Sequence, residues 1–97
     1  MDANAKFEFD PAKRQAVLEF RGLDMGRTRE VFAGPTLTFM DGRKDYGELR
    51  QITIGWLDYH MVVLVWTERG ADYRIISLRK ANDREQKLYS GRLGGPG

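Results

Sequence analysis

The spacing of apolar residues in the first part of the chain predicts a short strand followed by a helix. Residues 6–9 alternate, with both phenylalanines on one side, as in a strand. A helix is then predicted to begin at Asp10 and Pro11, because aspartate caps helices and proline suits their first position. We expect this helix to end near Phe20. The apolar stripe expected to face the core consists of Ala12, Ala16, Val17 and Phe20.

The next segment predicts a shorter helix, a strand and a loop. The helix covers residues 26–33, with Val31 and Phe32 facing inward, and a Gly-Pro pair ends it. Residues 36–40 then predict a short strand. The polar, glycine-punctuated residues 41–48 predict a loop.

Three strands with short connections follow this loop. Residues 50–56 alternate, residues 61–67 are apolar on both faces, and residues 73–79 alternate again. A strand that is apolar on both sides is typical of the centre of a covered sheet. Because the turns are short, we expect an antiparallel meander. The residues expected to share one face of the last strand are Tyr73, Ile75, Ser77 and Arg79.

A final helix is predicted to begin at Asn82, where Glu85 three residues later completes a capping box. Leu88 and Tyr89 are its expected packing residues, and Gly91 is its expected end. The resulting order is β-α-α-β-β-β-β-α. It predicts an α+β fold, in which a small twisted antiparallel sheet has helices packed mainly on one face.

Length and composition allow one domain and exclude several kinds of site. We expect a single domain over residues 1–90 and a disordered glycine-rich tail over residues 91–97. The absence of cysteine excludes disulfides, thiolate metal sites and a cysteine nucleophile, and one histidine excludes a histidine-rich metal site. We therefore expect no metal and no cofactor. With no signal peptide and no apolar run of membrane-spanning length, we expect a cytoplasmic protein without a membrane partner.

The distribution of charge points to the second half of the chain. The net charge is only +2, but 11 of the 16 basic residues are arginine. Residues 49–97 carry 8 basic and 5 acidic side chains, for +3, whereas residues 1–48 carry 8 and 9, for −1. Arginine suits phosphate recognition, so the pattern favours a phosphate-bearing partner. The alternative is an ordinary solvated surface with ion pairs.

Arginines also mark the ends of the predicted strands. Arg50 begins one strand, Arg69 follows the next, and Arg79 and Lys80 end the third. Arg50 and Arg79 would meet at one end of the sheet if their strands are close, and the loop residues Arg43 and Lys44 could close over the Arg50 end. Such a cluster suits a phosphodiester, whose transition state gains negative charge. The alternative is pairing with nearby carboxylates, for which the candidates are Asp45, Glu48, Glu68 and Asp72.

Other residue types give weaker signals. His60, in a predicted turn, is the default general acid or base by residue type, but no motif surrounds it. Tyr46, Tyr59 and Tyr73 can stack on a base or simply pack on the sheet. The sequence contains no catalytic triad order, no paired carboxylates at a defined spacing and no metal-ligand spacing.

Three groups of segments together resemble the BrnT family of toxins from bacterial type II toxin–antitoxin systems. The most specific are Asp-Tyr-Gly-Glu-Leu-Arg at residues 45–50 and Arg-Ile-Ile-Ser-Leu-Arg at residues 74–79. The others are Phe-Glu-Phe-Asp-Pro-Ala-Lys at 7–13, Val-Phe-Ala-Gly-Pro at 31–35 and Thr-Glu-Arg-Gly at 67–70. They follow the family's order and spacing over nearly all of residues 7–89.

The resemblance implies a fold like that of RelE-type ribonucleases and cleavage of RNA without a metal. It implies a ribbon-helix-helix antitoxin similar to BrnA, and contact with operator DNA only through the complex with this antitoxin. The positions that match functional residues are the catalytic Arg50, Arg69 and Arg79, with Arg43 and Lys80 as supporting substrate-binding residues. Tyr46 is a further candidate for substrate binding.

The first helix departs from the family pattern. Val17 stands where the family usually has asparagine, and Phe20-Arg21-Gly22 replaces Lys-His-Gly. If that Lys-His pair assists cleavage, this protein has weak or altered activity. The alternative function is then a catalytically silent homologue that binds antitoxin or nucleic acid.

The sequence offers several candidates for the general base of such a ribonuclease and does not decide among them. Glu48 and Glu68 are the candidates by acidity. Lys80, Tyr46 and Tyr89 would need pKa values lowered by the surrounding cations.

Overall fold

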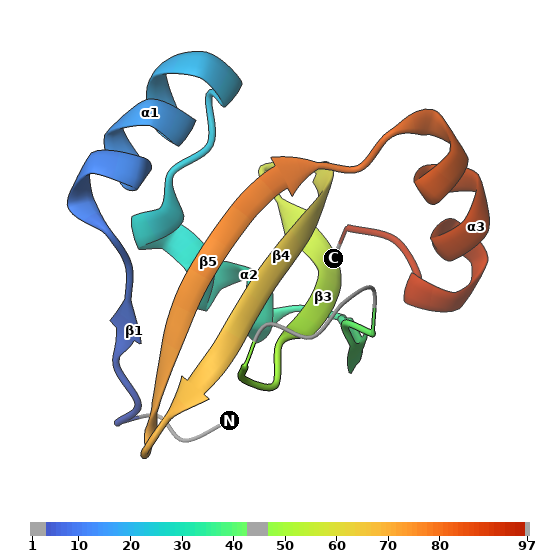
Figure 1. The fold of residues 1–97 in the computed structure, drawn as a ribbon. Coiled ribbons are helices and arrows are strands. Elements are labelled where there is room, and N and C mark those ends of the chain that lie inside the picture. Colours follow the sequence, from blue (N-terminus) through green and yellow to red (C-terminus); the bar gives the residue numbers. More distant parts are fainter. Residues whose placement is uncertain (1–3, 43–46, 97) are drawn as a thin grey trace.

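A computed structural model describes residues 4–42 and 47–96, which form one five-stranded sheet with helices around it (Figure 1). The strand order is β1-β5-β4-β3-β2, and all neighbours are antiparallel except β1, which pairs parallel to β5. The predicted order of elements and the α+β class are confirmed. The elements are β1 (Phe7–Glu8), α1 (Pro11–Arg21), the short 3-10 helix η1 (Met25–Arg27), α2 (Thr28–Ala33), β2 (Leu37–Met40), β3 (Gln51–Leu57), β4 (His60–Arg69), β5 (Asp72–Lys80) and α3 (Asp83–Leu93).

The two ends of α1 form as predicted, but Val17 is the one residue of its expected apolar stripe that is buried. The Asp10 carboxylate accepts a hydrogen bond from the Ala12 N–H at 2.9 Å, and Gly22 ends the helix with φ of +68°. Val17 is buried, whereas Phe20 is 82% exposed. The reason is the position of α1, which lies beside β5 at the margin of the sheet (Figure 1), so one side of the helix faces the core and Phe20 faces solvent.

The sheet is covered on both faces around β4, as its apolar sequence predicts. Val62, Leu64 and Trp66 point to the face covered by α1, η1 and α2. Met61 and Val63 point to the opposite face, where α3 packs. We call these the helical face and the α3 face. No helix within the described residues has the length and apolar character needed to cross a bilayer.

A β-bulge in β5 changes which of its side chains share a face. Trp66 pairs with Ile75 and Val65 pairs with Ser77, so Ile76 is an extra residue without a partner. Leu78 therefore joins Ile75 in the helical-face core, and Ser77 and Arg79 turn to the α3 face. The expectation that Tyr73, Ile75, Ser77 and Arg79 share one face is wrong for this reason.

The capping box that begins α3 is confirmed, but the helix ends later than expected. The Asn82 side chain accepts from the Glu85 N–H, and the Glu85 carboxylate accepts from the Asn82 N–H. The helix continues through Gly91 to Leu93, which is buried on the α3 face, so the predicted end at Gly91 is wrong. Leu88, an expected packing residue, is 59% exposed instead.

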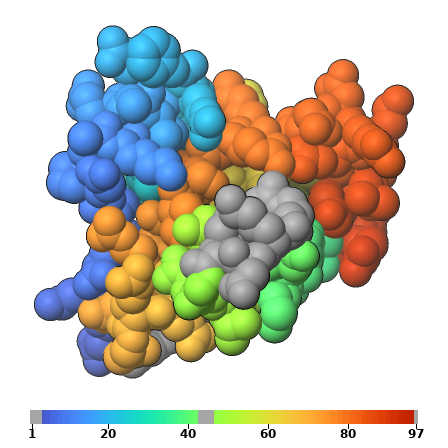
Figure 2. All heavy atoms as spheres, in the orientation of Figure 1, coloured from blue at the N-terminus to red at the C-terminus, as the bar shows by residue number. Residues whose placement is uncertain are grey.

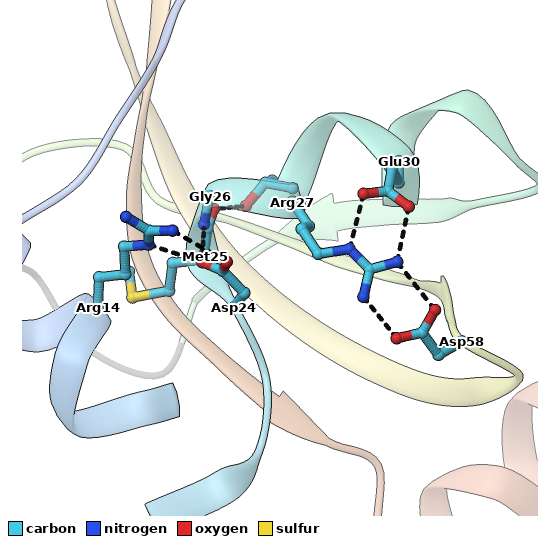
Figure 3. Close-up of polar contacts among 8 residues, drawn as sticks. Arg14, Asp24, Met25, Gly26, Arg27, Glu30 and Asp58 are labelled. Carbon is cyan, nitrogen blue, oxygen red and sulfur yellow. Dashed lines mark hydrogen bonds and ion pairs between the residues drawn. The ribbon is translucent and has the colours of Figure 1, made fainter. Parts of the chain in front are cut away.

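A polar network joins the helices to the turn between β3 and β4 (Figure 3). The Asp24 carboxylate accepts from the Gly26 N–H and pairs with Arg14 at 2.7 Å, and these contacts lower the pKa of Asp24 to about 2. Arg27 lies between the carboxylates of Glu30 and Asp58 and binds both. This network fixes η1 and α2 against the sheet, at the end opposite the site described next.

Candidate functional site

Basic side chains from three parts of the chain meet where β3 and β5 begin. Both strands run antiparallel to β4 and therefore parallel to each other, so their starts lie at the same end of the sheet. Arg50 immediately precedes β3, Arg74 lies near the start of β5, and Arg69 ends β4. Together they line a cavity of about 240 Å³ with residues from the start of α1. The lining residues are Asp10, Lys13, Glu48, Arg50, Arg69, Arg74, Ile75 and Ile76.

We call this cavity the basic cleft, and its cations are Lys13, Arg50, Arg69 and Arg74. Figure 2 shows the side of the molecule on which α1 (blue) and α3 (red) stand at either side of the strands. The four cations outnumber the two carboxylates of the lining. The cleft is therefore suited to bind an anion.

Glu48 lies between two of these arginines. Its carboxylate accepts from Arg50 Nε at 3.4 Å and from an Arg69 guanidinium nitrogen at 3.5 Å. Both distances are longer than those of ordinary hydrogen bonds, which cluster near about 2.9 Å. The side chains of Glu48 and Arg69 are 32% and 54% exposed. A phosphate group can therefore reach the exposed Arg69 and replace the Glu48 carboxylate there.

Arg74 is a member of the cleft that the sequence analysis missed. It pairs across the sheet with Thr67, and this places its side chain on the same face as Arg50. The signal was present, because Tyr73 and Ile75 alternate inward and so direct the residue between them outward. Arg74 lies within its strand, whereas the charge pattern singles out arginines at the ends of strands.

Arg79 lies at the other end of the sheet, so the expectation that it meets Arg50 is wrong. It pairs with Val63, far along β4 from the residues beside Arg50. Two strands that share an antiparallel neighbour run in the same direction, so the start of β3 and the end of β5 lie at different ends of the sheet. Arg79 instead binds both carboxylate oxygens of Glu85, at 2.7 and 2.9 Å.

The remaining predicted site residues lie outside the cleft or outside the described residues. Glu68 alternates to the helical face and lines a neighbouring cavity of about 520 Å³, which shares Glu48 and Arg69 with the basic cleft. Lys80 pairs with Val62 and also points to the helical face. The residues that fall outside the described part of the chain are Arg43, Lys44, Asp45 and Tyr46.

Residues 9–85 match the model of a protein family described as BrnT, the ribonuclease toxin of type II toxin–antitoxin systems. The chain belongs to this family. The match covers most of the 97 residues, including every cation of the basic cleft, and confirms the resemblance stated above. A type II ribonuclease toxin has RNA as its substrate and a cognate antitoxin as its partner. A comparison with proteins of curated function gives no match.

The three residues expected from the resemblance to depart from the BrnT pattern, Val17, Phe20 and Arg21, all lie in α1. Val17 is buried in the helical-face core. Arg21 donates a hydrogen bond from its guanidinium to the Leu78 carbonyl at 2.9 Å and so binds the helix to β5. Phe20 lines a further cavity of about 310 Å³. Two of the three residues thus have a structural contact, while Phe20 is exposed.

Acid is expected to weaken the attachment of α3 through Glu85. The hydrogen bond from Arg79 lowers the pKa of this carboxyl from 4.5 to about 2 in the folded chain. Because the pKa of Glu85 is lower in the folded chain than in the unfolded chain, the ion pair stabilises the fold fully at pH values above 4.5. This stabilisation is lost as the pH falls toward about 2. We expect Arg79→Ala to remove this part of the acid dependence. The measurement is the urea midpoint across this pH range.

Arg84→Ala is the matched control, because Arg84 is exposed on the same helix. We expect it to keep the acid dependence of the unchanged protein. Equal acid dependence in all three proteins would show that the Arg79–Glu85 pair does not hold α3.

Proposed function

We propose that this chain is a metal-independent endoribonuclease that cleaves RNA by attack of a ribose 2′-hydroxyl on the adjacent phosphate. The observation that carries the proposal is the arrangement of Arg50, Arg69 and Arg74 around Glu48 at one end of the sheet. It combines a set of fixed cations for a phosphate with a carboxylate beside them.

The proposed reaction uses the cations for charge and Glu48 for proton transfer. Arg50 and Arg69 bind the non-bridging phosphoryl oxygens, where negative charge builds up in the transition state. Glu48, released from these arginines, accepts the proton of the 2′-hydroxyl. The 2′-oxygen forms a bond to phosphorus while the bond to the 5′-oxygen breaks, and the leaving oxygen takes a proton from water. The products are a 2′,3′-cyclic phosphate and a 5′-hydroxyl end.

The other predicted site residues keep different roles in this proposal. Arg79 lies on the same face as Arg74, and we assign it to contact with the RNA backbone beyond the cleft. Of the two carboxylates considered as base, Glu48 is favoured, because Glu68 alternates away from Arg50 and Arg74. Substrate binding by Arg43, Tyr46 and Lys80 stays a prediction.

The test is incubation of the purified protein with RNA in the presence of EDTA. We expect cleavage to continue and the new ends to be a 2′,3′-cyclic phosphate and a 5′-hydroxyl, identified by mass spectrometry. We expect Glu48→Gln to lose most of the activity while it still binds RNA. A requirement for added divalent cations, or products with 5′-phosphate ends, would contradict the proposed chemistry.

We also propose that the cognate antitoxin is a ribbon-helix-helix protein similar to BrnA, through which the toxin reaches operator DNA. The alternative, a silent homologue that only binds antitoxin or nucleic acid, is favoured by the departures in α1. Induced expression separates the two: growth arrest that the co-expressed antitoxin relieves supports the toxin. Normal growth with retained antitoxin binding supports the silent homologue.

A further inference from the structure

An aromatic side chain stands exposed on α1 beside the proposed reaction site. Phe20 is 82% exposed, although Val17, one turn earlier on the same helix, is buried. The ring lines a cavity of about 310 Å³ between α1 and β5. The other lining residues are Lys13, Ala16, Val17, Arg21 and Ser77. A large apolar ring exposed beside a cavity leaves one of its surfaces available to a ligand.

This cavity continues the basic cleft. Lys13 lines both, so the two cavities adjoin at this side chain. The floor is continuous as well, because β5 supplies Arg74 and Ile76 to the cleft and Ser77 to the cavity. A chain bound to the arginines of the cleft can therefore pass along β5 toward Phe20.

Positive charge accompanies the ring along this path. Lys13 lies on α1 about two turns before Phe20, and Arg21 follows it directly. The hydrogen bond from Arg21 to the Leu78 carbonyl holds this cation beside the cavity. A ring between two cations matches a nucleotide, in which an apolar base is joined to a charged backbone. Ala16, one turn before Phe20, is small and leaves room beside the ring.

We infer that Phe20 is a stacking platform for a nucleobase next to the phosphate held in the basic cleft, and that the substrate is single-stranded RNA. The inference rests on the function proposed above. Every base has a face that can stack on an aromatic ring, so this contact binds without choosing a sequence. Bases within a duplex are already stacked on their neighbours, so only an unpaired strand can offer one to Phe20.

The test is binding of a short RNA in which every 2′-hydroxyl is methylated, because such RNA lacks the nucleophile and is not cleaved. Affinity for the single strand and for its duplex is measured by fluorescence anisotropy. We expect Phe20→Ala to weaken binding of the single strand about tenfold, within the range known for base stacking on aromatic residues. We expect Phe20→Trp to retain it, and the duplex to bind weakly to every variant.

Tyr59→Ala is the matched control, because Tyr59 is also 82% exposed but lies in the turn between β3 and β4. We expect it to bind the single strand as the unchanged protein does. A second probe is the same strand with a single abasic position, placed at each nucleotide in turn. At one position the abasic strand should bind Phe20→Ala and the unchanged protein equally.

Two results would overturn the inference. One is equal binding of the single strand by Phe20→Ala and the unchanged protein, and the other is equal preference for duplex and single strand. Loss of antitoxin binding in Phe20→Ala, with RNA binding intact, would assign the ring to the partner protein. Cleavage of ordinary RNA by the unchanged protein is measured separately, so failure of the proposed function is distinguished from failure of the stacking site.

Discussion

Replacement of Arg50 by alanine is expected to lower the rate of RNA cleavage by about 100-fold or more. Removal of one fixed donor to a developing oxyanion has effects of about 10² to 10³ in comparable sites. Arg50 is the cation of the basic cleft whose side chain is only 25% exposed, and it contacts Glu48. Its loss removes charge at the phosphate and also the neighbour that positions Glu48. The measurement is the initial rate of cleavage of a fluorescent RNA.

Arg50→Lys and Arg84→Ala are the controls for this prediction. Lysine keeps the charge but not the forked geometry, so we expect an intermediate rate. Arg84 is an exposed arginine of α3, away from the cleft, and its removal should leave the rate unchanged. The circular dichroism of all variants should agree. A full rate in Arg50→Ala together with a lost rate in Arg79→Ala would move the site to the other end of the sheet.

Replacement of Trp66 by alanine is expected to lower the free energy of unfolding by about 3–5 kcal/mol, the usual cost for a buried large aromatic residue. Trp66 is 6% exposed and packs edge-on against Tyr73 and Phe32, with ring centroids 4.9 and 5.6 Å away. Its indole N–H donates to the buried Thr53 hydroxyl at 2.8 Å. The substitution therefore leaves a cavity where β4, β5 and α2 meet. Urea unfolding followed by circular dichroism measures the change.

Trp66→Phe separates the packing of the ring from its hydrogen bond. We expect it to cost much less than Trp66→Ala, because most of the buried ring remains and Thr53 still contacts the Thr38 hydroxyl at 2.8 Å. Equal midpoints for the unchanged protein and Trp66→Ala would show that this aromatic cluster does not hold the sheet to α2.

The elements of this fold are predictable because their signals are local. The Asp10 side chain, next to Pro11, binds a backbone N–H in the first turn of α1. At the start of α3, Asn82 and Glu85 bind each other's backbone N–H groups. The two-sided apolar pattern of β4 identifies the central strand without any neighbour being known. Such patterns depend on the residue and its close sequence neighbours, so they are visible in the sequence.

The faces of these elements are less predictable, because they depend on what packs against them. Phe20 and Leu88 are apolar yet exposed. Leu93 is buried, although it lies two residues beyond Gly91, the expected end of the helix. The extra residue Ile76 depends on how β4 and β5 accommodate each other, and no local pattern marks it. Without this bulge, alternation would place Arg74 and Arg79 on opposite faces. The sequence therefore indicates the residue types of the site better than their grouping.

The basic cleft can form only late in the synthesis of the chain. Its cations come from residues 13 to 74 of 97, and β1 joins the sheet by pairing with β5, for example Phe7 with Tyr73. Contacts between such distant segments form after the later one has been synthesised. The cleft therefore does not exist on a growing chain until β5 has left the ribosome. On the function proposed above, such a toxin gains its ribonuclease activity only at the end of its own synthesis.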